Sequence, residues 1–584
     1  MKADIEPAAH GGDAVAAALE AQGVRLLFTL CGGHISPILS GAKARGIRVV
    51  DTRGEAAAVF AADAAARLTG IPGVAAVTAG PGVTNAVTAL KNAQMAQSPV
   101  VLLGGAAPTL LQGRGALQDI DQHPIAAPNV KFLRRIRRVR DLIPAVADAF
   151  AAARSGVQGP AFVECPVDIL YEEALVRQWY GAAASKGAGI MGRILRFYIE
   201  RHLASMFGGN AATKPHKPRQ AGTPAAPLAS VSAAAEALSH AKRPIAIIGS
   251  QALSAGGNPD AAAGAISRLG IPVYLSGMAR GLLGRQHPLQ LRHKRREALK
   301  EADCVILAGV PCDFRLDYGG HVRRSATLIA ANRSRKEARL NRTPDIAAIG
   351  DAGLFLSQLA GEAHGSTSRW QDWIAGLHAR DAAREAGIAE QAKVEGEFVN
   401  PIALLKAVDV AASDDAIFVA DGGDFVATAS YILRPRGPLG WLDPGPFGTL
   451  GVGGGFALGA ALCRPGAEIW AIFGDGALGY SIAEFDTFVR HGIPIIAVVG
   501  NDACWTQIAR EQVKVLKDDV ATTLARSAYH EVAAGFGAEG ILVKSNAEVP
   551  EALARAKAAA KAGKPVLINA WLDRTAFREG SLSM

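Results

Sequence analysis

Two neighbouring segments near the end of the chain decide the fold: Glu468-Ile-Trp-Ala-Ile-Phe-Gly-Asp-Gly-Ala-Leu-Gly-Tyr480 and Ile493-Pro-Ile-Ile-Ala-Val-Val-Gly-Asn-Asp502. Each is a short apolar run of strand length, followed by a glycine turn with an oxygen-bearing side chain, Asp475 in the first and Asn501 in the second. Residues 481–491 between them have apolar side chains at helical spacing. A right-handed crossover makes such strands parallel, so we expect Asp475 and Asn501 at one edge of an α/β sheet.

These two side chains suggest a metal site. One carboxylate and one amide oxygen, completed by phosphate oxygens, suit Mg²⁺. Gly474 and Gly476 let the backbone approach an anion closely. A Gly-Asp-Gly tripeptide alone is a common turn, but Asn501 closes the next strand after 24 residues (477–500). The pair therefore favours a diphosphate–Mg²⁺ site.

Composition limits the classes of protein to consider. A chain of 584 residues, 49% hydrophobic and 20% charged, predicts three or four globular domains. Its six cysteines show no Cys-x-x-Cys spacing, which favours a reducing compartment, and we expect the cytoplasm. We find no signal peptide and no apolar run long enough for a membrane span. The net charge of +9 suggests anionic ligands, but no nucleic-acid-binding motif accompanies it.

Residues 1–178 alternate helices with short apolar strands, which predicts an α/β domain. Glu55 begins an alanine-rich helix, where the helix dipole alone would favour a carboxylate. A second helix opens with Gly80-Pro-Gly-Val-Thr-Asn85, and Asn85 is expected to shape the wall of a site, for example through helix capping. The strands are expected at 24–30, 46–51, 74–78, 99–104 and 160–165.

The remaining chain divides into three parts. Residues 179–227 hold an amphipathic helix at 190–207 and a linker; we favour packing of this helix on its own protein, with a membrane surface as the alternative. Residues 228–365 form a middle α/β domain with strands at 244–249, 272–276, 304–310, 327–331 and 346–350. Residues 395–584 contain the opening segments, a strand at 416–421 and a glycine-rich loop at 441–455.

The chain resembles thiamine-diphosphate enzymes of the acetolactate synthase family. The resemblance covers nearly the whole chain and rests on Glu55 with its alanine-rich helix, on Gly80-Pro-Gly-Val-Thr-Asn85 and on the Gly-Asp-Gly…Asn pattern. It implies three consecutive α/β domains with mainly parallel sheets, in the order pyrimidine-binding, middle and diphosphate-binding. One departure is Asp502, which stands where that pattern commonly has a second asparagine. We expect Asp502 to serve the turn or to add negative charge near the metal.

The resemblance also implies the cofactors and their contacts. Thiamine diphosphate and Mg²⁺ are expected, and the middle domain would hold FAD, ADP or nothing. Glu55 would hydrogen-bond the aminopyrimidine ring, and Leu450 would separate the two rings of the cofactor. The other expected cofactor-binding residues are Asn85, Gly448, Gly474, Asp475, Gly476, Ala477 and Asn501, and the expected metal ligands are Asp475, Asn501 and Ala503.

Two further residues are candidates for the substrate side of the site. His34 follows a strand and could transfer protons to a substrate oxygen, with a structural role as an equal alternative. Gln118 matches a glutamine that lines the site in acetolactate synthases. In this family the first and last domains meet across a subunit interface, so a homodimer or homotetramer is expected.

The resemblance favours one function over two others. It implies a lyase that splits a 2-hydroxyacyl-CoA into formyl-CoA and an aldehyde, or catalyses the reverse reaction. The alternative is acetolactate synthesis from two 2-oxo acids. The third, a non-catalytic scaffold on the same fold, conflicts with the presence of Glu55, Asp475 and Asn501. Arg280, Arg285 and Arg574 could meet the phosphates of CoA.

Overall fold

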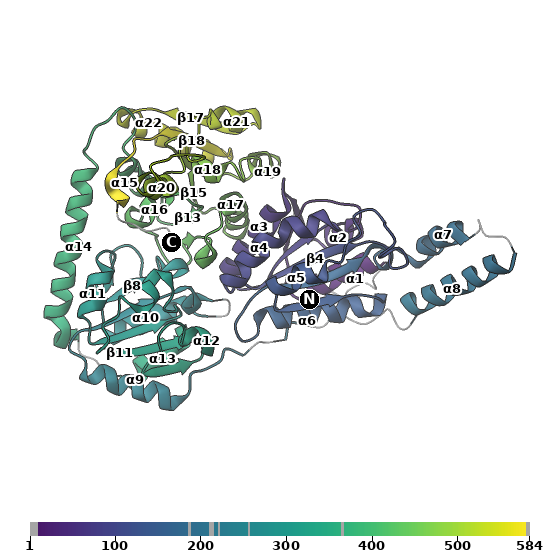
Figure 1. The fold of residues 1–584 in the computed structure, drawn as a ribbon, viewed down its shortest axis with the longest axis horizontal. Helices are drawn as coiled ribbons and strands as arrows, with labels where there is room; N and C mark the ends of the chain where they lie inside the picture. Colours follow the sequence, from purple (N-terminus) through teal and green to yellow (C-terminus); the bar gives the residue numbers. More distant parts are fainter. Residues whose placement is uncertain are drawn as a thin grey trace. The chain divides into compact units, whose positions relative to one another are not determined.

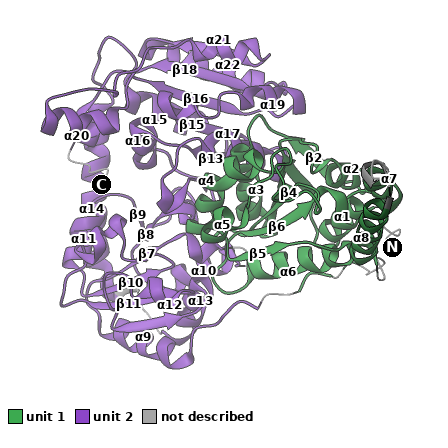
Figure 2. Ribbon diagram, turned by 45° about the vertical axis from the view of Figure 1, so that its right-hand side comes forward, with its two compact units in different colours: residues 1–221 green, residues 222–584 purple. Residues whose placement is uncertain are grey.

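The computed structural model describes residues 10–184, 189–208, 215, 217–219, 222–254, 257–363 and 367–579. The chain forms two compact units, residues 1–221 and 222–584, whose boundary falls inside the predicted linker (Figure 1, Figure 2). Three six-stranded parallel sheets follow one another along the chain, one in the first unit and two in the second. The predicted α/β fold with parallel sheets is therefore confirmed.

Unit 1 has one sheet with the strand order β2-β1-β3-β4-β6-β5. Its central strands are buried on both faces, as is usual for a parallel sheet covered by helices. Helices α1, α2 and α6 pack on the face that includes Leu27, Val101 and Leu103, and α3 and α4 lie on the other face. The strands are β1 (Leu26–Thr29), β2 (Arg48–Asp51), β3 (Gly73–Val77), β4 (Val100–Ala106), β5 (Phe132–Arg135) and β6 (Ala161–Pro166). The helices are α1 (Gly11–Ala21), α2 (Ser36–Ala44), α3 (Glu55–Thr69), α4 (Pro81–Met95), α5 (His123–Ala126), α6 (Leu142–Arg154), α7 (Glu173–Ala184) and α8 (Gly189–Phe207).

The first sheet of unit 2 is the middle sheet, with the order β12-β11-β10-β7-β8-β9. Helices α9, α10 and α13 pack on one face, and α11 packs on the other. Its strands are β7 (Pro244–Ile248), β8 (Val273–Leu275), β9 (Gln290–Leu291), β10 (Cys304–Ala308), β11 (Thr327–Asn332) and β12 (Ile346–Ile349). Its helices are α9 (Leu228–His240), α10 (Pro259–Leu269), α11 (Arg295–Glu301), α12 (Arg335–Ala338), α13 (Ala352–Glu362) and the long α14 (Gln371–Gln391).

The second sheet of unit 2 is the C-terminal sheet, with the order β14-β13-β15-β16-β18-β17. β15 and β16 are parallel neighbours with Gly474 opposite Gly500, as the opening segments predicted. The strands are β13 (Ile417–Ala420), β14 (Trp441–Leu442), β15 (Ile469–Gly474), β16 (Ile496–Asn501), β17 (Glu539–Val543) and β18 (Val566–Trp571). The helices are α15 (Pro401–Ala411), α16 (Asp424–Ile432), α17 (Val452–Cys463), α18 (Asp475–Leu478), α19 (Glu484–His491), α20 (Thr506–Leu516), α21 (Tyr529–Gly535) and α22 (Val549–Lys561).

The structure also shows where the sequence interpretation was incomplete. Five strands, β5, β9, β14, β17 and β18, have no counterpart among the predicted ones. β5 reads Phe-Leu-Arg-Arg and is a half-buried edge strand, so its apolar signal is weak. β9 and β14 have two residues each, and β14 lies at the start of the segment 441–455 that was predicted as a loop. No helix among the described residues is both long and apolar enough to cross a membrane.

Candidate active site

The predicted metal pair lies at the carboxyl ends of β15 and β16. Asp475 begins the short helix α18, and Asn501 is the last residue of β16. Both side chains are buried, and one oxygen of each, Asp475 Oδ2 and Asn501 Oδ1, has no hydrogen-bond partner. The side-chain amide nitrogen of Asn501 is held in place, because Nδ2 donates to Asn569 Oδ1 at 3.1 Å and to the Ser527 carbonyl oxygen at 3.3 Å. Buried polar atoms without partners are rare in folded proteins. These two oxygens therefore fit a bound cation.

The electrostatics of Asp475 agree with a cation site. Burial, reinforced by the nearby Asp502 carboxylate, raises the pKa of Asp475 to about 7. The backbone amides of Gly476, Ala503 and Cys504 oppose this shift by donating to the carboxylate. A positive ion would restore the ionised form, since an opposite charge favours it.

Asp502 has both of the expected effects. It serves the turn, because its Oδ2 accepts a hydrogen bond from the Thr506 hydroxyl, and it adds negative charge beside Asp475. Ala503 follows it with a positive φ of 54°, a strained conformation for alanine that often marks a functional turn. The Ala503 carbonyl oxygen accepts from the Leu524 amide at 2.9 Å and keeps a second lone pair. Its role as a metal ligand stays a prediction.

A third buried carboxylate, Asp421, was not predicted as a site residue. It follows β13 and accepts hydrogen bonds from the amides of Gly451 at 2.8 Å and Gly453 at 2.7 Å. Burial raises its pKa to about 7. The two bonds hold the loop that carries Leu450, whose Cδ2 lies 2.1 Å from the point where a Cβ on Gly422 would stand. Glycine at 422 is thus required for Leu450 to occupy its place.

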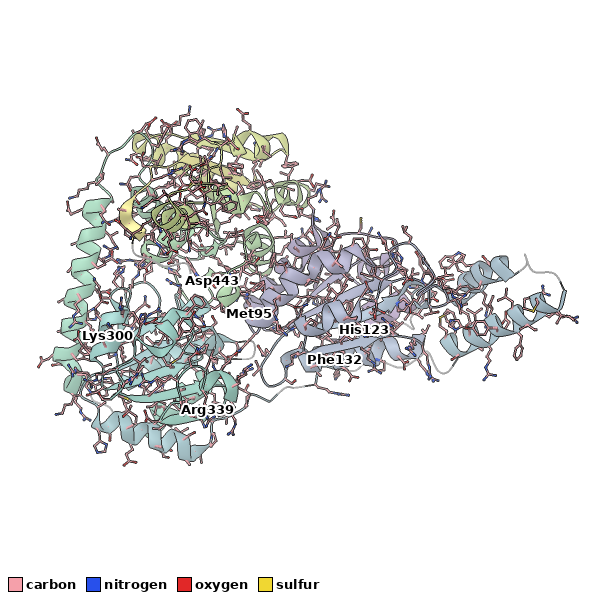
Figure 3. The ribbon with its side chains drawn as sticks, in the orientation of Figure 1. Met95, His123, Phe132, Lys300, Arg339 and Asp443 are labelled. Carbon is pink, nitrogen blue, oxygen red and sulfur yellow. The ribbon has the colours of Figure 1, made fainter. Side chains whose placement is uncertain are left out.

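These elements surround one cavity of about 620 Å³. Its wall includes the expected cofactor-binding residues Gly448, Leu450, Gly474, Asp475, Gly476 and Ala477. Asn501 is fully buried. Asn501 and Ala503 do not line the cavity themselves, but their chain neighbours Gly500, Asp502 and Cys504 do. Asp443, labelled in Figure 3, lines the same cavity from the loop after β14. The structure therefore brings six of the predicted C-terminal residues into one cavity wall, with Asn501 and Ala503 next to it in the chain.

In unit 1, Glu55 begins α3 and is buried. The Asn85 amide Nδ2 donates to Glu55 Oε2 at 3.1 Å. Asn85 is thus a direct partner of Glu55, a closer relation than the capping role considered from the sequence. The second oxygen, Oε1, lies 3.6 Å from the position of a Cβ on Gly82. Gly82, in the first turn of α4, therefore places no side chain beside Oε1.

The two predicted substrate-side residues meet through a residue that the sequence did not reveal. His34 Nδ1 lies 3.1 Å from Thr78 Oγ1, and the Thr78 hydroxyl donates to Gln118 Oε1 at 3.4 Å. Since the hydroxyl has a single proton, Nδ1 of His34 carries the hydrogen of the first bond. Burial lowers the pKa of His34, which favours a neutral ring with Nε2 as an acceptor.

Gln122 supports the same region. It accepts from the Gly80 amide at 3.0 Å and donates to the Gly105 carbonyl at 3.1 Å and to Glu164 Oε2 at 3.2 Å. A Cβ on Gly105 would come within 2.6 Å of His34 Cβ. Gln122 therefore joins the turn before α4 to the strand behind His34.

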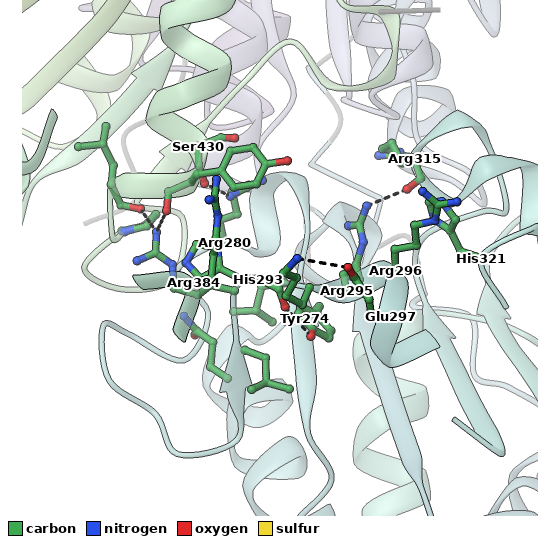
Figure 4. A pocket seen from close by; sticks show the side chains of 18 of the residues that line it. Tyr274, Arg280, His293, Arg295, Arg296, Glu297, Arg315, His321, Arg384 and Ser430 are labelled. Atoms are coloured by element: carbon green, nitrogen blue, oxygen red, sulfur yellow. Dashed lines mark hydrogen bonds and ion pairs between the residues drawn. The ribbon is translucent and has the colours of Figure 1, made fainter. Parts of the chain in front are cut away.

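A second cavity in unit 2, of about 710 Å³, lies between the middle sheet and the helices of the C-terminal sheet (Figure 4). Its wall carries seven arginines and a single acid, Glu297. Burial lowers the pKa of Arg292 to about 10, with nearby Arg434 adding to the effect. This concentration of positive charge, most of it half-buried, fits a strongly anionic ligand. The arginines are Arg280, Arg292, Arg295, Arg296, Arg315, Arg384 and Arg578.

The cavity of about 710 Å³ is called the basic cavity below, and the cavity of about 620 Å³, which holds the expected cofactor-binding residues, the cofactor cavity. The two adjoin each other, because Arg280, Phe314 and Ser430 line both. Arg280 is held at this junction by a bond from Nη1 to the Ser430 carbonyl at 2.7 Å and by its place over the Trp441 ring. The other two predicted arginines lie elsewhere. Arg285 is paired with Asp409 and Asp414, and Arg574 donates to the Asp502 carbonyl at 3.4 Å.

The carboxyl edge of the middle sheet, where FAD, ADP or nothing was expected, has side chains that pair with one another. Its predicted glycine turns are filled by the protein's own groups: Arg333 forms a buried ion pair with Asp351 at 2.7 Å, and Gln251 bonds Asn332 at 3.1 Å. A Cβ on Gly350 would come within 2.5 Å of the Ala226 amide nitrogen. These side chains at the strand ends therefore have partners within the protein.

Comparison with known proteins covers the same three regions. Models of the thiamine pyrophosphate enzymes match residues 9–125 as the N-terminal TPP binding domain, 231–359 as the central domain and 421–570 as the C-terminal TPP binding domain.

Relatives match along the whole chain. A 2-hydroxyacyl-CoA lyase 2 of Bos taurus is 52% identical and that of Homo sapiens is 51% identical, over 100% of this chain and 93% of each relative. A probable acetolactate synthase of Mycobacterium bovis is 36% identical over 98% of both chains.

Proposed function

The chain belongs to the thiamine pyrophosphate enzymes, and from that premise we propose that it is a Mg²⁺-dependent lyase that cleaves 2-hydroxyacyl-CoA to formyl-CoA and an aldehyde, or joins them. The bond between the carbonyl carbon and the hydroxyl-bearing carbon breaks. The hydroxyl proton is released as the aldehyde forms, and a proton is added to the formyl carbon, so atoms balance. The relatives that are about half identical to this chain bear a lyase name of this kind.

One observation carries the choice of a CoA substrate: the basic cavity meets the cofactor cavity at Arg280. CoA has phosphates at one end and the reacting thioester at the other, joined by a long flexible arm. Arginine is suited to phosphate because it presents several donors in a planar fork. The phosphates would lie among the arginines while the acyl group enters the cofactor cavity.

Each site residue then has a physical role. Asp475 and Asn501 would hold Mg²⁺ through their partnerless oxygens, and the ion would in turn bind the diphosphate. Thiamine diphosphate, when bound, supplies the electron sink that cleavage next to a carbonyl requires. Glu55, oriented by Asn85, would exchange a proton with the aminopyrimidine ring. His34 Nε2 would accept the proton of the substrate hydroxyl.

The alternative, acetolactate synthesis from 2-oxo acids, keeps support from Gln118 and from the relatives that are 36% identical. Small 2-oxo acids carry no phosphates that would use the positive charge of the basic cavity. We therefore place it second.

In the deciding experiment, purified protein is supplied with thiamine diphosphate and Mg²⁺ and is incubated with either a 2-hydroxyacyl-CoA or pyruvate. The products formyl-CoA and acetolactate are then measured. We expect formyl-CoA, and acetolactate as the main product would overturn the proposal. Glu55→Gln should lower turnover by about 10²- to 10⁴-fold while the cofactor still binds.

The cavity assignment has its own test. Arg295→Gln should raise the KM for the CoA substrate about tenfold with kcat nearly unchanged, because the Arg295 guanidinium, which also donates to the Arg315 carbonyl at 2.7 Å, would meet only the remote end of the substrate. The matched control is Arg285→Gln, which lies outside the cavity and should leave both constants unchanged. Equal effects of the two substitutions would contradict the proposal that CoA binds in the basic cavity.

Two further expectations form part of the proposal. The protein would work in the cytoplasm, as its cysteine usage suggests. It would assemble as a homodimer or homotetramer, which light scattering of the purified protein measures directly.

A further inference from the structure

The first half of α8 exposes a broad apolar face. Ile190, Met191, Ile194, Leu195, Phe197 and Tyr198 are all exposed, with Met191 at 74% and Phe197 at 70%. At 100° per residue these six side chains cover about 160° of the helix circumference. Trp179 on the adjacent α7 is exposed as well. Single exposed apolar residues are common, but a contiguous patch marks an interaction surface.

The second half of the same helix is anchored. Ile199, Leu203 and Met206 are buried in the core of unit 1. His202 Nε2 lies 2.7 Å from the Thr109 hydroxyl, which itself donates to Asp168 at 2.6 Å. The helix therefore packs on its own protein, as the sequence favoured, but only through its second half. The contrast between the two halves shows that packing within the chain does not explain the exposed face.

A polar network fixes the position of this hairpin of α7 and α8. Tyr180 on α7 donates to Asp168 at 2.7 Å, and Arg177 pairs with Glu200 across the two helices at 2.5 Å. Figure 1 and Figure 2 both show α7 and α8 side by side at one end of unit 1. The exposed face is thus held on a rigid base.

The charge of the helix selects the partner. Arg193, Arg196 and Arg201 have no ion-pair or hydrogen-bond partner among the described residues, whereas Glu200, the acid of α8, is neutralised by Arg177. Arg193 and Arg196 lie on the side of the helix away from the apolar face. An exposed apolar face with aromatic residues, backed by unpaired arginines, fits the boundary between lipid headgroups and acyl chains.

We propose that the first half of α8 docks this protein on an anionic lipid surface, with the apolar face in the bilayer boundary and the arginines among phosphate-bearing headgroups. The docking is independent of the lyase activity. It would place near a membrane the loop after β4, because Thr109, which anchors α8, belongs to the same loop as Gln118.

The test uses the full chain and sedimentation with vesicles of phosphatidylcholine, with or without phosphatidylserine. We expect binding to the anionic vesicles that weakens with added salt. Ile194→Ser with Phe197→Ser should reduce binding at least tenfold, and Arg193→Gln with Arg196→Gln should reduce it about fivefold for each arginine removed. The matched control is Val410→Ser, an exposed apolar residue of α15, which should bind like the unmodified protein.

Light scattering and turnover of a short-chain substrate accompany each variant. Unchanged turnover shows that a variant is folded. It also separates this proposal from the lyase proposal, because a variant can lose vesicle binding and keep its turnover. Binding that is absent, or equal in all variants, overturns the docking. So does a lower particle mass in the Ile194→Ser, Phe197→Ser protein, because a second copy would then be what covers the face.

Discussion

The C-terminal sheet and the middle sheet are two parallel six-stranded sheets in one unit, and their carboxyl edges are used in opposite ways. At the edge of β15 and β16, Asp475 and Asn501 keep oxygens without partners, and the pKa of Asp475 is raised to about 7. At the edge of β11 and β12, Arg333 and Asp351 satisfy each other in a buried ion pair.

This difference shows what identifies a ligand site on this fold. Both edges have glycine turns after apolar strands, so the turns do not separate them. Ligand sites lie at strand ends in many α/β proteins. Asp351 at the middle edge has partners for both carboxylate oxygens, whereas Asp475 at the C-terminal edge keeps one buried oxygen without a partner. At an edge where buried side chains pair with one another, those side chains stabilise the fold and are not free to bind a ligand.

The largest expected effect is at the C-terminal edge. Asp475→Ala should lower turnover by at least 10³-fold, because the protein loses its charged metal ligand. The amount of thiamine diphosphate that stays bound during gel filtration in Mg²⁺ shows whether lost cofactor binding causes the lower turnover. Normal retention would remove Asp475 from the metal site.

The matching substitution in the middle sheet should affect stability instead. Asp351→Ala leaves Arg333 buried without its partner and should cost about 3–5 kcal/mol of unfolding free energy. Urea unfolding measures the loss, and cofactor retention below the transition should stay normal. Adding Arg333→Met should recover part of the stability, and the comparison fails if cofactor retention falls with the single substitution.

The pH dependence of metal binding tests the cause of the raised pKa. Mg²⁺ binds the ionised carboxylate, so its apparent affinity should fall about tenfold per pH unit below about 7 and level off above it. Asp502→Asn removes a neighbouring negative charge, so it should lower the pKa of Asp475 and move this midpoint to lower pH. Affinity that does not change between about pH 5 and pH 8 would contradict the assignment.

The smallest effect concerns nucleotides at the middle sheet. Since that edge is filled by its own side chains, added FAD or ADP should not change the melting temperature of the purified protein. The visible absorbance spectrum should likewise show no flavin. A flavin spectrum would mean that the Arg333–Asp351 pair opens.

Much of this could be predicted from the sequence, for a physical reason. Apolar strands followed by glycine turns are local signals, so β15, β16, Asp475 and Asn501 were predicted correctly as neighbours at one edge. The resemblance to a known family supplied Glu55, whose place at the start of a helix has a local explanation of its own.

What could not be predicted depends on contacts between distant parts of the chain. Thr78 is unremarkable in sequence and gains its meaning only between His34 and Gln118. The basic cavity combines residues from 274 to 578. The local run 292–296 supplies three of its seven arginines, but the other four come from distant parts of the chain, so the run alone does not reveal a cavity. Asp421, by contrast, follows a buried strand as Asp475 does, and that signal could have found it.

Trp505 packs against the glycine of the metal turn so closely that a Cβ on Gly476 would come within 2.4 Å of its ring. The indole therefore lines the same cavity as Asp475 and Gly476. Its intrinsic fluorescence provides a built-in optical reporter, with which occupancy of the site can be followed in real time without any label.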